Sequence, residues 1–210
     1  MVVRPIVVVG LLGLAVACLS SCGGGGGGDA STPERTTTFS SLASFDGYII
    51  WPGSISAAGT AVDLGDTFDN SWTWGFYRFE HASLPFGATV IGASLRVYQF
   101  QVTGTPYSDL SHVYVDHVDL GSGLDASDMA STALTSDVGT ISVDATLGYK
   151  TLDVTAQVKA DLSAARITSD FRLAFWFGTN ANDAPDFARF TDAEDLQGIG
   201  NPPELVVTWR

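Results

Sequence analysis

Cysteine, histidine and lysine are scarce in this 210-residue sequence. Its two cysteines, Cys18 and Cys22, both lie near the start, and no other thiol follows them. A domain without a cysteine pair has no disulfide framework, so its hydrophobic core must hold it together. The same absence excludes a cysteine nucleophile in the remainder of the chain.

Positive charge is also lacking. Lys150 and Lys159 are the only lysines, and 10 Lys and Arg residues stand against 23 Asp and Glu, which gives a formal net charge of −13. Nucleic acids and anionic lipid head groups repel a chain with this charge. The sequence therefore excludes nucleic-acid binding and disfavours a strongly polyanionic polysaccharide as a ligand.

Patterns typical of catalytic and metal sites are missing as well. The sequence has no Gly-x-Ser-x-Gly nucleophile elbow. Its three histidines are His81, His112 and His117. An odd separation along a strand places His112 and His117 on opposite faces, so they form no local metal pair. We expect all three on the surface or in loops.

The N-terminus has the pattern of an export signal. Arg4 precedes a nearly unbroken apolar run, Ile6 to Leu19, which is too short to span a membrane. The run ends in Leu19-Ser20-Ser21-Cys22, which resembles the bacterial lipobox. This implies that residues 1–21 are a lipoprotein signal peptide and that Cys22 is acylated and bound to a lipid bilayer. The alternative is an ordinary signal peptide with an incidental cysteine.

Residues 22–44 are predicted to be the acylated cysteine and a flexible tether. They are rich in Gly, Ser and Thr, include the run Gly23–Gly28, and have little apolar content. A chain of this composition and length spans about 25 Å on average. Gly23, directly after the cysteine, resembles lipoproteins that are sent on to the outer membrane. We therefore expect the protein in the cell envelope, at the outer membrane or cell surface.

Residues 45–210 are predicted to form one all-β domain. Apolar and polar residues alternate in short segments, and turns rich in Gly, Pro, Asn and Asp separate these segments. The alternating segments are 48–51, 74–80, 90–102, 112–118, 140–143, 171–177 and 205–209. This pattern indicates an antiparallel β-sandwich or barrel. One segment has helical spacing instead, because Val158, Leu162 and Ala165 follow a capping Thr155. It predicts one short helix.

Several short motifs follow one another along the domain: Tyr77–Glu80, Leu84–Ala88, Ile91–Tyr98, Asp153–Val158, Arg189–Phe190 and Pro203–Trp209. Their order and spacing, over nearly all of residues 45–210, resemble those of the DNRLRE-type domains. The resemblance implies a single jelly-roll-like β-sandwich that acts as a non-catalytic module on secreted or surface proteins. Some relatives are classed as carbohydrate-binding modules. The family's late polar motif and its tryptophan-rich loop are not kept here, and a fold alone transfers no ligand site.

Two acidic segments are candidate calcium sites. One contains Asp63, Asp66 and Asp69, and the other contains Asn180, Asn182, Asp183 and Asp186. Hard oxygen ligands from flexible loops are what Ca²⁺ requires, although neither segment fits the EF-hand pattern. A structural Ca²⁺ is therefore the one cofactor that we expect. The alternative is a pair of solvated acidic loops that protect a sheet edge.

Aromatic residues give the candidate ligand site. Tyr77, Phe79, Phe175, Phe177 and Trp209 are expected to point inward, whereas Arg96, Tyr98, Arg172 and Trp176 fall on the opposite faces of their strands. Sugar rings stack on planar aromatic groups, and arginine donates to their hydroxyls. Trp72 and Trp74 form an independent candidate in a loop. The alternative is that a loop or the helix covers this face and makes it a second core layer.

The sequence thus favours a surface-anchored, non-catalytic binding or structural module, with a glycan as the expected ligand. A polysaccharide lyase on a jelly roll is the competing enzyme hypothesis, and it requires Arg96, Tyr98, Arg172 and His117 to converge. A purely architectural envelope lipoprotein, without a small ligand, is the third hypothesis.

The anchor is testable by Cys22→Ser. We expect the parent to fractionate with membranes, because several acyl chains, each contributing about 0.8 kcal/mol per buried methylene, attach a protein stably. The variant should appear in the soluble fraction. Equal membrane recovery of the variant and the parent, compared by immunoblot, would show that Cys22 is not the anchor.

Overall fold

The computed structural model describes residues 32–57, 61–194 and 198–210. The predicted signal peptide and Cys22 lie outside the described residues. The strands are β1 (Arg35–Ser40), β2 (Gly47–Ile50), β3 (Ser54–Ala57), β4 (Val62–Asp66), β5 (Trp72–Glu80), β6 (Val90–Thr103), β7 (Val113–Val118), β8 (Thr135–Ser142), β9 (Gly148–Asp153), β10 (Thr168–Phe175), β11 (Asp186–Phe190) and β12 (Glu204–Trp209). The helices are α1 (Pro106–Asp109), the 3-10 helix η1 (Ala126–Ala130) and α2 (Thr155–Ser163). The all-β prediction is confirmed.

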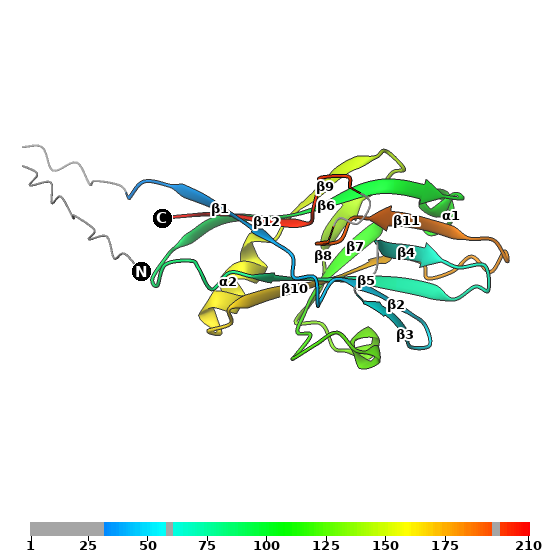
Figure 1. Cartoon of the computed structure of the whole chain (residues 1–210), viewed down its shortest axis with the longest axis horizontal. Coiled ribbons are helices and arrows are strands. Elements are labelled where there is room, and N and C mark those ends of the chain that lie inside the picture. The colour runs from blue at the N-terminus through cyan, green and yellow to red at the C-terminus, as the bar shows by residue number, and fades with distance from the viewer. Residues whose placement is uncertain (1–31, 58–60, 195–197) are drawn as a thin grey trace, which may run out of the picture. The chain divides into compact units, whose positions relative to one another are not determined.

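The strands form one curled antiparallel sheet in the order β1-β12-β6-β11-β4-β5-β10-β7-β8. In addition, β9 pairs with β6, β2 pairs with β5, and β3 pairs with β2. Because the sheet curls, β6 and β12 face β5 and β10 across the interior, as Figure 1 shows. The arrangement is sandwich-like.

The core lies between these two halves. Strand β6 buries Ala93, Leu95 and Val97 on its inner face, as the alternation predicted. Tyr77 and Phe79 of β5 belong to the same hydrophobic cluster. Each fully buried side chain of this size contributes about 1.5–3 kcal/mol, so the domain needs no disulfide.

Strand β1 corrects the predicted start of the domain. Residues Arg35–Ser40 were expected in the tether, but they pair antiparallel with β12, and Phe39 is buried in the core. The threonines between Arg35 and Phe39 suit an edge strand with one exposed face. The ordered domain therefore begins about ten residues before residue 45.

Helix α2 confirms the predicted short helix, but its N-cap residue is Val154 and not the expected Thr155. Val158 is buried in the core cluster, and Leu162 packs against it. The segments α1 and η1 were not predicted. Within the described residues, no helix is long and apolar enough to cross a membrane.

The outer face of β5, β10 and β7 carries two buried ion pairs. Arg78 is directly opposite Asp170 in the ladder, and Arg172 is directly opposite Asp116. Each pair closes at 2.6 Å, and all four side chains are nearly inaccessible. Such pairs offset their desolvation cost only with good geometry and further hydrogen bonds.

The segment between β7 and β8 supplies those further bonds. Arg78 donates to the carbonyl of Gly121, and the amide of Leu120 donates to Asp170. Above the ion pairs, a second hydrophobic cluster forms from Ile49, Phe76, Val118, Leu120 and Met129. Residues 119–134 therefore cover much of this face, and the alternative of a second core layer holds for that part of it.

We expect Asp116→Ala to lower the free energy of unfolding by about 3–5 kcal/mol, because Arg172 would keep an uncompensated buried charge. Asp119→Ala is the control. Asp119 is more than half exposed and lies 3.8 Å from Arg166, and such a pair contributes about 0–1 kcal/mol. Urea unfolding curves measure both values. Equal losses in the two variants would contradict the structural role of the buried pair.

Candidate functional site

An aromatic hollow lies at the end of β10. It is a cavity of about 320 Å³, and its lining residues are Trp72, Trp74, Tyr114, Phe175, Trp176, Phe177, Gly178 and Thr179. The hollow brings together the two aromatic candidates of the sequence, the Trp72–Trp74 pair and Trp176. They meet because the first residues of β5 lie beside the last residues of β10.

Trp176 is the exposed aromatic anchor of the hollow. It follows the last residue of β10, and 51% of its surface is accessible. Its backbone N–H donates to the carbonyl of His112 at 2.9 Å. The imidazole of His112 stacks on the indole with ring centroids 5.5 Å apart, and Tyr114 meets it edge-on at 5.7 Å. The indole is thus oriented before any ligand arrives.

Trp72 forms one wall and depends on a glycine. Its ring stacks on Trp51 at 5.6 Å with planes only 9° apart. A Cβ at Gly178 would lie 2.9 Å from the ring of Trp72, closer than van der Waals contact allows. A glycine is therefore required where the chain leaves Trp176 and passes over Trp72.

Arg172 supports the hollow from beneath. Its guanidinium carbon lies 4.5 Å from the ring centre of Trp74, a cation–π contact. Only 7% of Arg172 is exposed, and it donates to Asp116 and to the carbonyls of residues 128, 129 and 131. The expectation that Arg172 reaches a ligand is wrong, because residues 119–134 cover it.

Two residues of the hollow were misjudged or missed. Phe177 was expected in the core but is 55% exposed, because β10 ends at Phe175 and the alternation ends with it. Tyr114 was not singled out, although it belongs to the predicted strand 112–118. Burial raises the pKa of the Tyr114 phenol above its ordinary value. A phenol is protonated at neutral pH even at that ordinary value, so the Tyr114 hydroxyl is able to donate a hydrogen bond.

Arg96 and Tyr98 lie elsewhere. They are on the outer face of β6, in the opposite half of the sheet from β10. Tyr149 of β9 packs against both, 4.2 Å from the Arg96 guanidinium carbon and 5.2 Å from the ring centre of Tyr98. Arg96 also forms an ion pair with Glu204 at 2.6 Å. The predicted glycan face is therefore two separate aromatic clusters.

The residues of the lyase hypothesis do not converge. His117 is buried 2.9 Å from Asp161, Arg172 is held by Asp116, and Arg96 and Tyr98 lie in the other half of the sheet. His117 and His81 also correct the expectation of surface histidines, because both are almost completely buried.

The two buried histidines belong to one polar network in the interior. Ser169 donates to Asp161 at 2.6 Å and lies 3.2 Å from His81. Burial lowers the pKa of His81, which favours its neutral form. The network joins α2, β10, β7 and the residue that follows β5, and no alternation pattern shows such a connection.

The first predicted calcium segment does not form a cluster. Asp63 and Asp66 belong to β4, where Asp63 pairs with Arg189 at 3.0 Å. Burial raises the pKa of Asp63, and the bond to Arg189 opposes this rise. Asp69, in the following turn, accepts hydrogen bonds from Thr67 and Ser71. The prediction that these three carboxylates together coordinate Ca²⁺ is therefore wrong for this structure.

The second predicted calcium segment, Asn180 to Asp186, contacts Asp66 of the first segment. Asp186 and Asp66 are direct partners in the β4–β11 ladder, and both are buried. Asn180 and Asn182 donate to Asp186, while the backbone N–H of Asn180 donates to Asp66. Asp183 is exposed and accepts from Asn70. We call Asp66, Asp186, Asn180 and Asn182 the acidic corner.

One oxygen of the acidic corner lacks a partner. Asp66 Oδ2 accepts from Thr179 at 2.6 Å, but Asp66 Oδ1 is buried without a hydrogen bond. In the described part of the chain, no group of three or more His, Cys, Asp or Glu side chains is arranged to hold a metal ion. A cation here would need neutral oxygen ligands besides the two carboxylates.

Comparison with known proteins adds no family. A scan against protein-family models finds no match to the chain, and a search of curated proteins finds no similar one. The functional argument therefore depends on the geometry of the aromatic hollow and the acidic corner.

Proposed function

We propose that this protein is a lipid-anchored, non-catalytic binding module of the bacterial cell envelope, and that its ligand is a neutral carbohydrate. The observation that carries the proposal is the half-exposed indole of Trp176, held by His112 and Tyr114 beside Trp72 and Trp74. A large aromatic side chain kept exposed and oriented is typical of a recognition surface.

The chemistry of the hollow fits a sugar ring. The apolar face of a pyranose stacks on an indole, and the hollow offers Trp176 for this contact. Tyr114 and Thr179 line the same cavity, and the hydroxyl of Tyr114 supplies a hydrogen-bond donor and acceptor for a sugar there. The net charge of −13 favours an uncharged sugar over a polyanionic one.

The resemblance to DNRLRE-type domains supports a non-catalytic role within this proposal. The lipobox-like segment ending at Cys22 supports the anchor, and with Gly23 it favours the outer membrane. Cys22 acylation would keep the binding domain outside the cytoplasm, where envelope or environmental glycans are present.

We expect Trp176→Ala to weaken glycan binding by about 1–3 kcal/mol while barely changing the melting temperature, because the variant removes an exposed stacking anchor. Tyr98→Ala is the matched control, since it removes an aromatic side chain from the other cluster. Neutral oligosaccharides are first screened on a glycan array, and the strongest ligand is then titrated by calorimetry.

Three results would contradict the proposal. The first is that the parent binds none of the neutral oligosaccharides, and the second is that Tyr98→Ala alone abolishes binding. The third is that Trp176→Ala lowers the free energy of unfolding by about 3–5 kcal/mol, as truncation of a core aromatic residue does. Release of reducing ends from a polysaccharide by the purified parent would favour the lyase hypothesis instead.

We also propose that calcium binds at the acidic corner. Asp66 and Asp186 are direct cross-strand neighbours, and like charges in this position destabilise a sheet unless a cation separates them. The unpartnered Oδ1 of Asp66 gives a hard oxygen for such a cation. Asn180 and Thr179, which already contact Asp66, would supply neutral oxygen atoms.

Thermal unfolding tests this second proposal. A cation bound only by the folded state raises the melting temperature, so we expect an increase with millimolar calcium and a decrease with chelator. Asp66→Asn should abolish the response, whereas Asp69→Asn, at an exposed position, should keep it. A melting temperature of the parent that does not change between calcium and chelator would exclude the site.

A further inference from the structure

The two ends of the sandwich differ in chemistry. The turn between β5 and β6, residues 81–89, marks one end, which we call the proximal end. Thr89 and Arg210 exchange backbone hydrogen bonds, and Arg35 is the ladder partner of Trp209. The start of β1 and the chain terminus therefore lie at the proximal end, as Figure 1 shows for the C-terminus.

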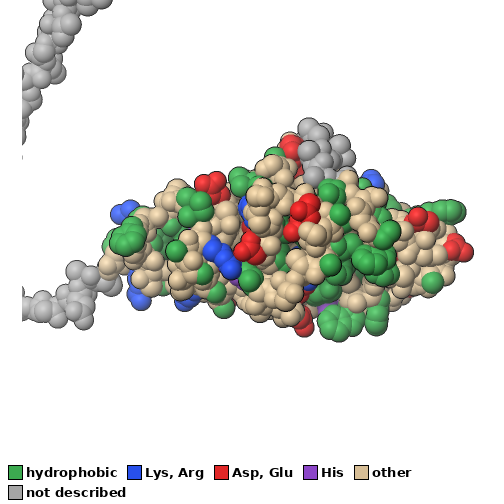
Figure 2. Space-filling view, turned by 90° about the horizontal axis from the view of Figure 1, so that it is seen from below, with side chains coloured by type: hydrophobic (Ala, Val, Ile, Leu, Met, Phe, Trp, Pro, Cys, Tyr) green, Lys and Arg blue, Asp and Glu red, His purple; other side chains and the backbone are tan. Residues whose placement is uncertain are grey.

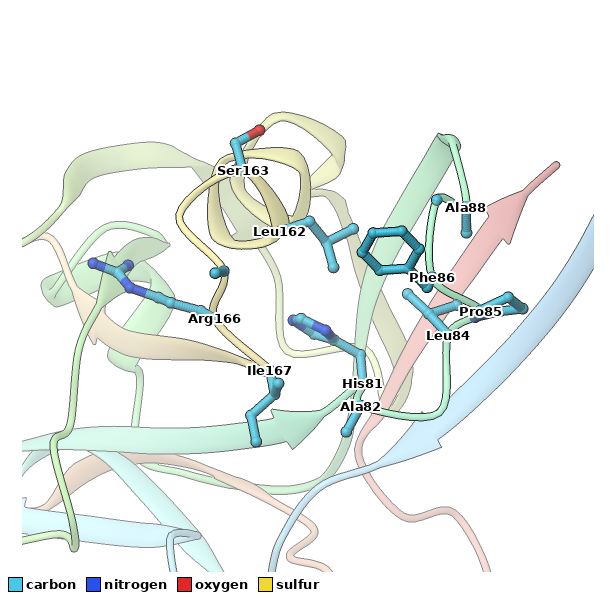
Figure 3. A pocket seen from close by; sticks show the side chains of 12 residues that line it. His81, Ala82, Leu84, Pro85, Phe86, Ala88, Leu162, Ser163, Arg166 and Ile167 are labelled. Atoms are coloured by element: carbon cyan, nitrogen blue, oxygen red, sulfur yellow. The ribbon is translucent and has the colours of Figure 1, made fainter.

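The proximal end exposes apolar side chains. Phe86, at the tip of the turn, is fully exposed, and Ile167 is 58% exposed. Both line a cavity of about 620 Å³ between this turn and the end of α2. Figure 3 shows Phe86, Leu162 and His81 gathered there, with Arg166 directed away. Phe86 is fully exposed and belongs to neither hydrophobic cluster of the core.

The two ends of the sandwich also differ in their content of charged residues. No Asp, Glu, Lys or Arg occurs from His81 to Leu95, although the whole chain has a net charge of −13. Around this stretch, Arg35 and Arg210 are exposed and offset Glu34 and Glu80. Figure 2 shows the blue side chains mostly toward this end and red ones over the middle and the other end.

The distal end is the opposite one, where β5 begins. It carries the acidic residues Asp66, Asp69, Asp109, Asp183 and Asp186, which lie at or beyond the ends of β4, β6 and β11. Strand β5 has nine residues, so the two ends are about 30 Å apart. An anionic bilayer surface would repel the distal end and tolerate the proximal one.

The connection to Cys22 points to the same end. Nine residues lie between Cys22 and Thr32, and the ten Cα–Cα steps that join them reach at most about 35 Å. Because β1 begins at the proximal end, an acyl group on Cys22 would keep this end within that reach of the membrane. This step depends on the lipid anchor proposed above.

We propose that the proximal end is a membrane-contact surface. In this arrangement the proximal end contacts the bilayer, and Phe86 lies in the interface between head groups and acyl chains. An apolar aromatic side chain on a neutral turn is suited to that interface. The aromatic hollow, formed by the first residues of β5 and the last of β10, then faces away from the bilayer.

The test uses the acylated full-length protein, in which Cys22 is consumed by the anchor and no other thiol follows. Ser83→Cys places one thiol in the proximal turn and leaves Phe86 intact. Phe68→Cys places one in the exposed turn at the distal end. Each variant is labelled with an environment-sensitive dye and reconstituted into vesicles of phosphatidylethanolamine with a minority of phosphatidylglycerol.

Nitroxide-labelled lipids then report the depth of each dye. We expect the dye at position 83 to lose most of its emission and the dye at position 68 to keep it. Adding Phe86→Ala to Ser83→Cys should restore much of the lost emission. Equal quenching at the two positions, or stronger quenching at position 68, would overturn the inference.

Vesicle flotation of the same samples separates this inference from the anchor. Protein that floats but remains unquenched at position 83 would overturn the membrane-contact surface and leave the anchor intact. Protein that does not float would overturn both. Equal melting temperatures of the two labelled variants serve as the control for folding.

Discussion

The buried Arg–Asp pairs on the outer face of β5, β10 and β7 are the interaction on which the rest of the structure depends. An arginine placed there requires a facing carboxylate, and Asp170 and Asp116 are the direct ladder partners of Arg78 and Arg172. Their remaining donors need carbonyl acceptors, which residues 121–131 supply. The ion pairs therefore fix where the covering segment lies.

That covering segment decides which aromatic residues are exposed. Phe76 lies beneath it in the second hydrophobic cluster, whereas Trp176 lies beyond the last residue of β10 and remains accessible. Trp74 lies at the boundary, above Arg172 and within the hollow. A pair of buried charges thus defines one border of the candidate ligand site.

The same feature explains how far the sequence predicts the site. Alternation correctly placed Arg172 and Trp176 on one face of their segment, but it does not show that residues forty positions away bury only the first. Trp176 and Trp72 were identified because large aromatic residues in outward or loop positions are visible in the sequence. Phe177 was misplaced because the strand ends at Phe175, two residues before the end of the apolar run.

The fold, like the site, was predicted where the sequence pattern is regular and missed where it is not. Long alternating segments such as β6 and β10 were predicted, and so was helix α2. Strands β4 and β11 were not, because their aspartates resemble loop residues. Their pairing explains why: Asp66 and Asp186 are buried against each other, where charge is normally excluded. Strand β1 was missed because it is mostly threonine and only Phe39 reaches the core.

Protection of tryptophan from iodide quenching tests the central claim most directly. The claim is that Trp176, together with Trp72 and Trp74, forms a preformed surface for a neutral sugar. Tryptophan emission of the purified protein is measured against iodide, with and without a panel of neutral oligosaccharides. The account predicts that at least one oligosaccharide lowers the quenching constant in the parent and leaves it unchanged in Trp176→Ala. A quenching constant in the parent that no oligosaccharide changes would contradict it.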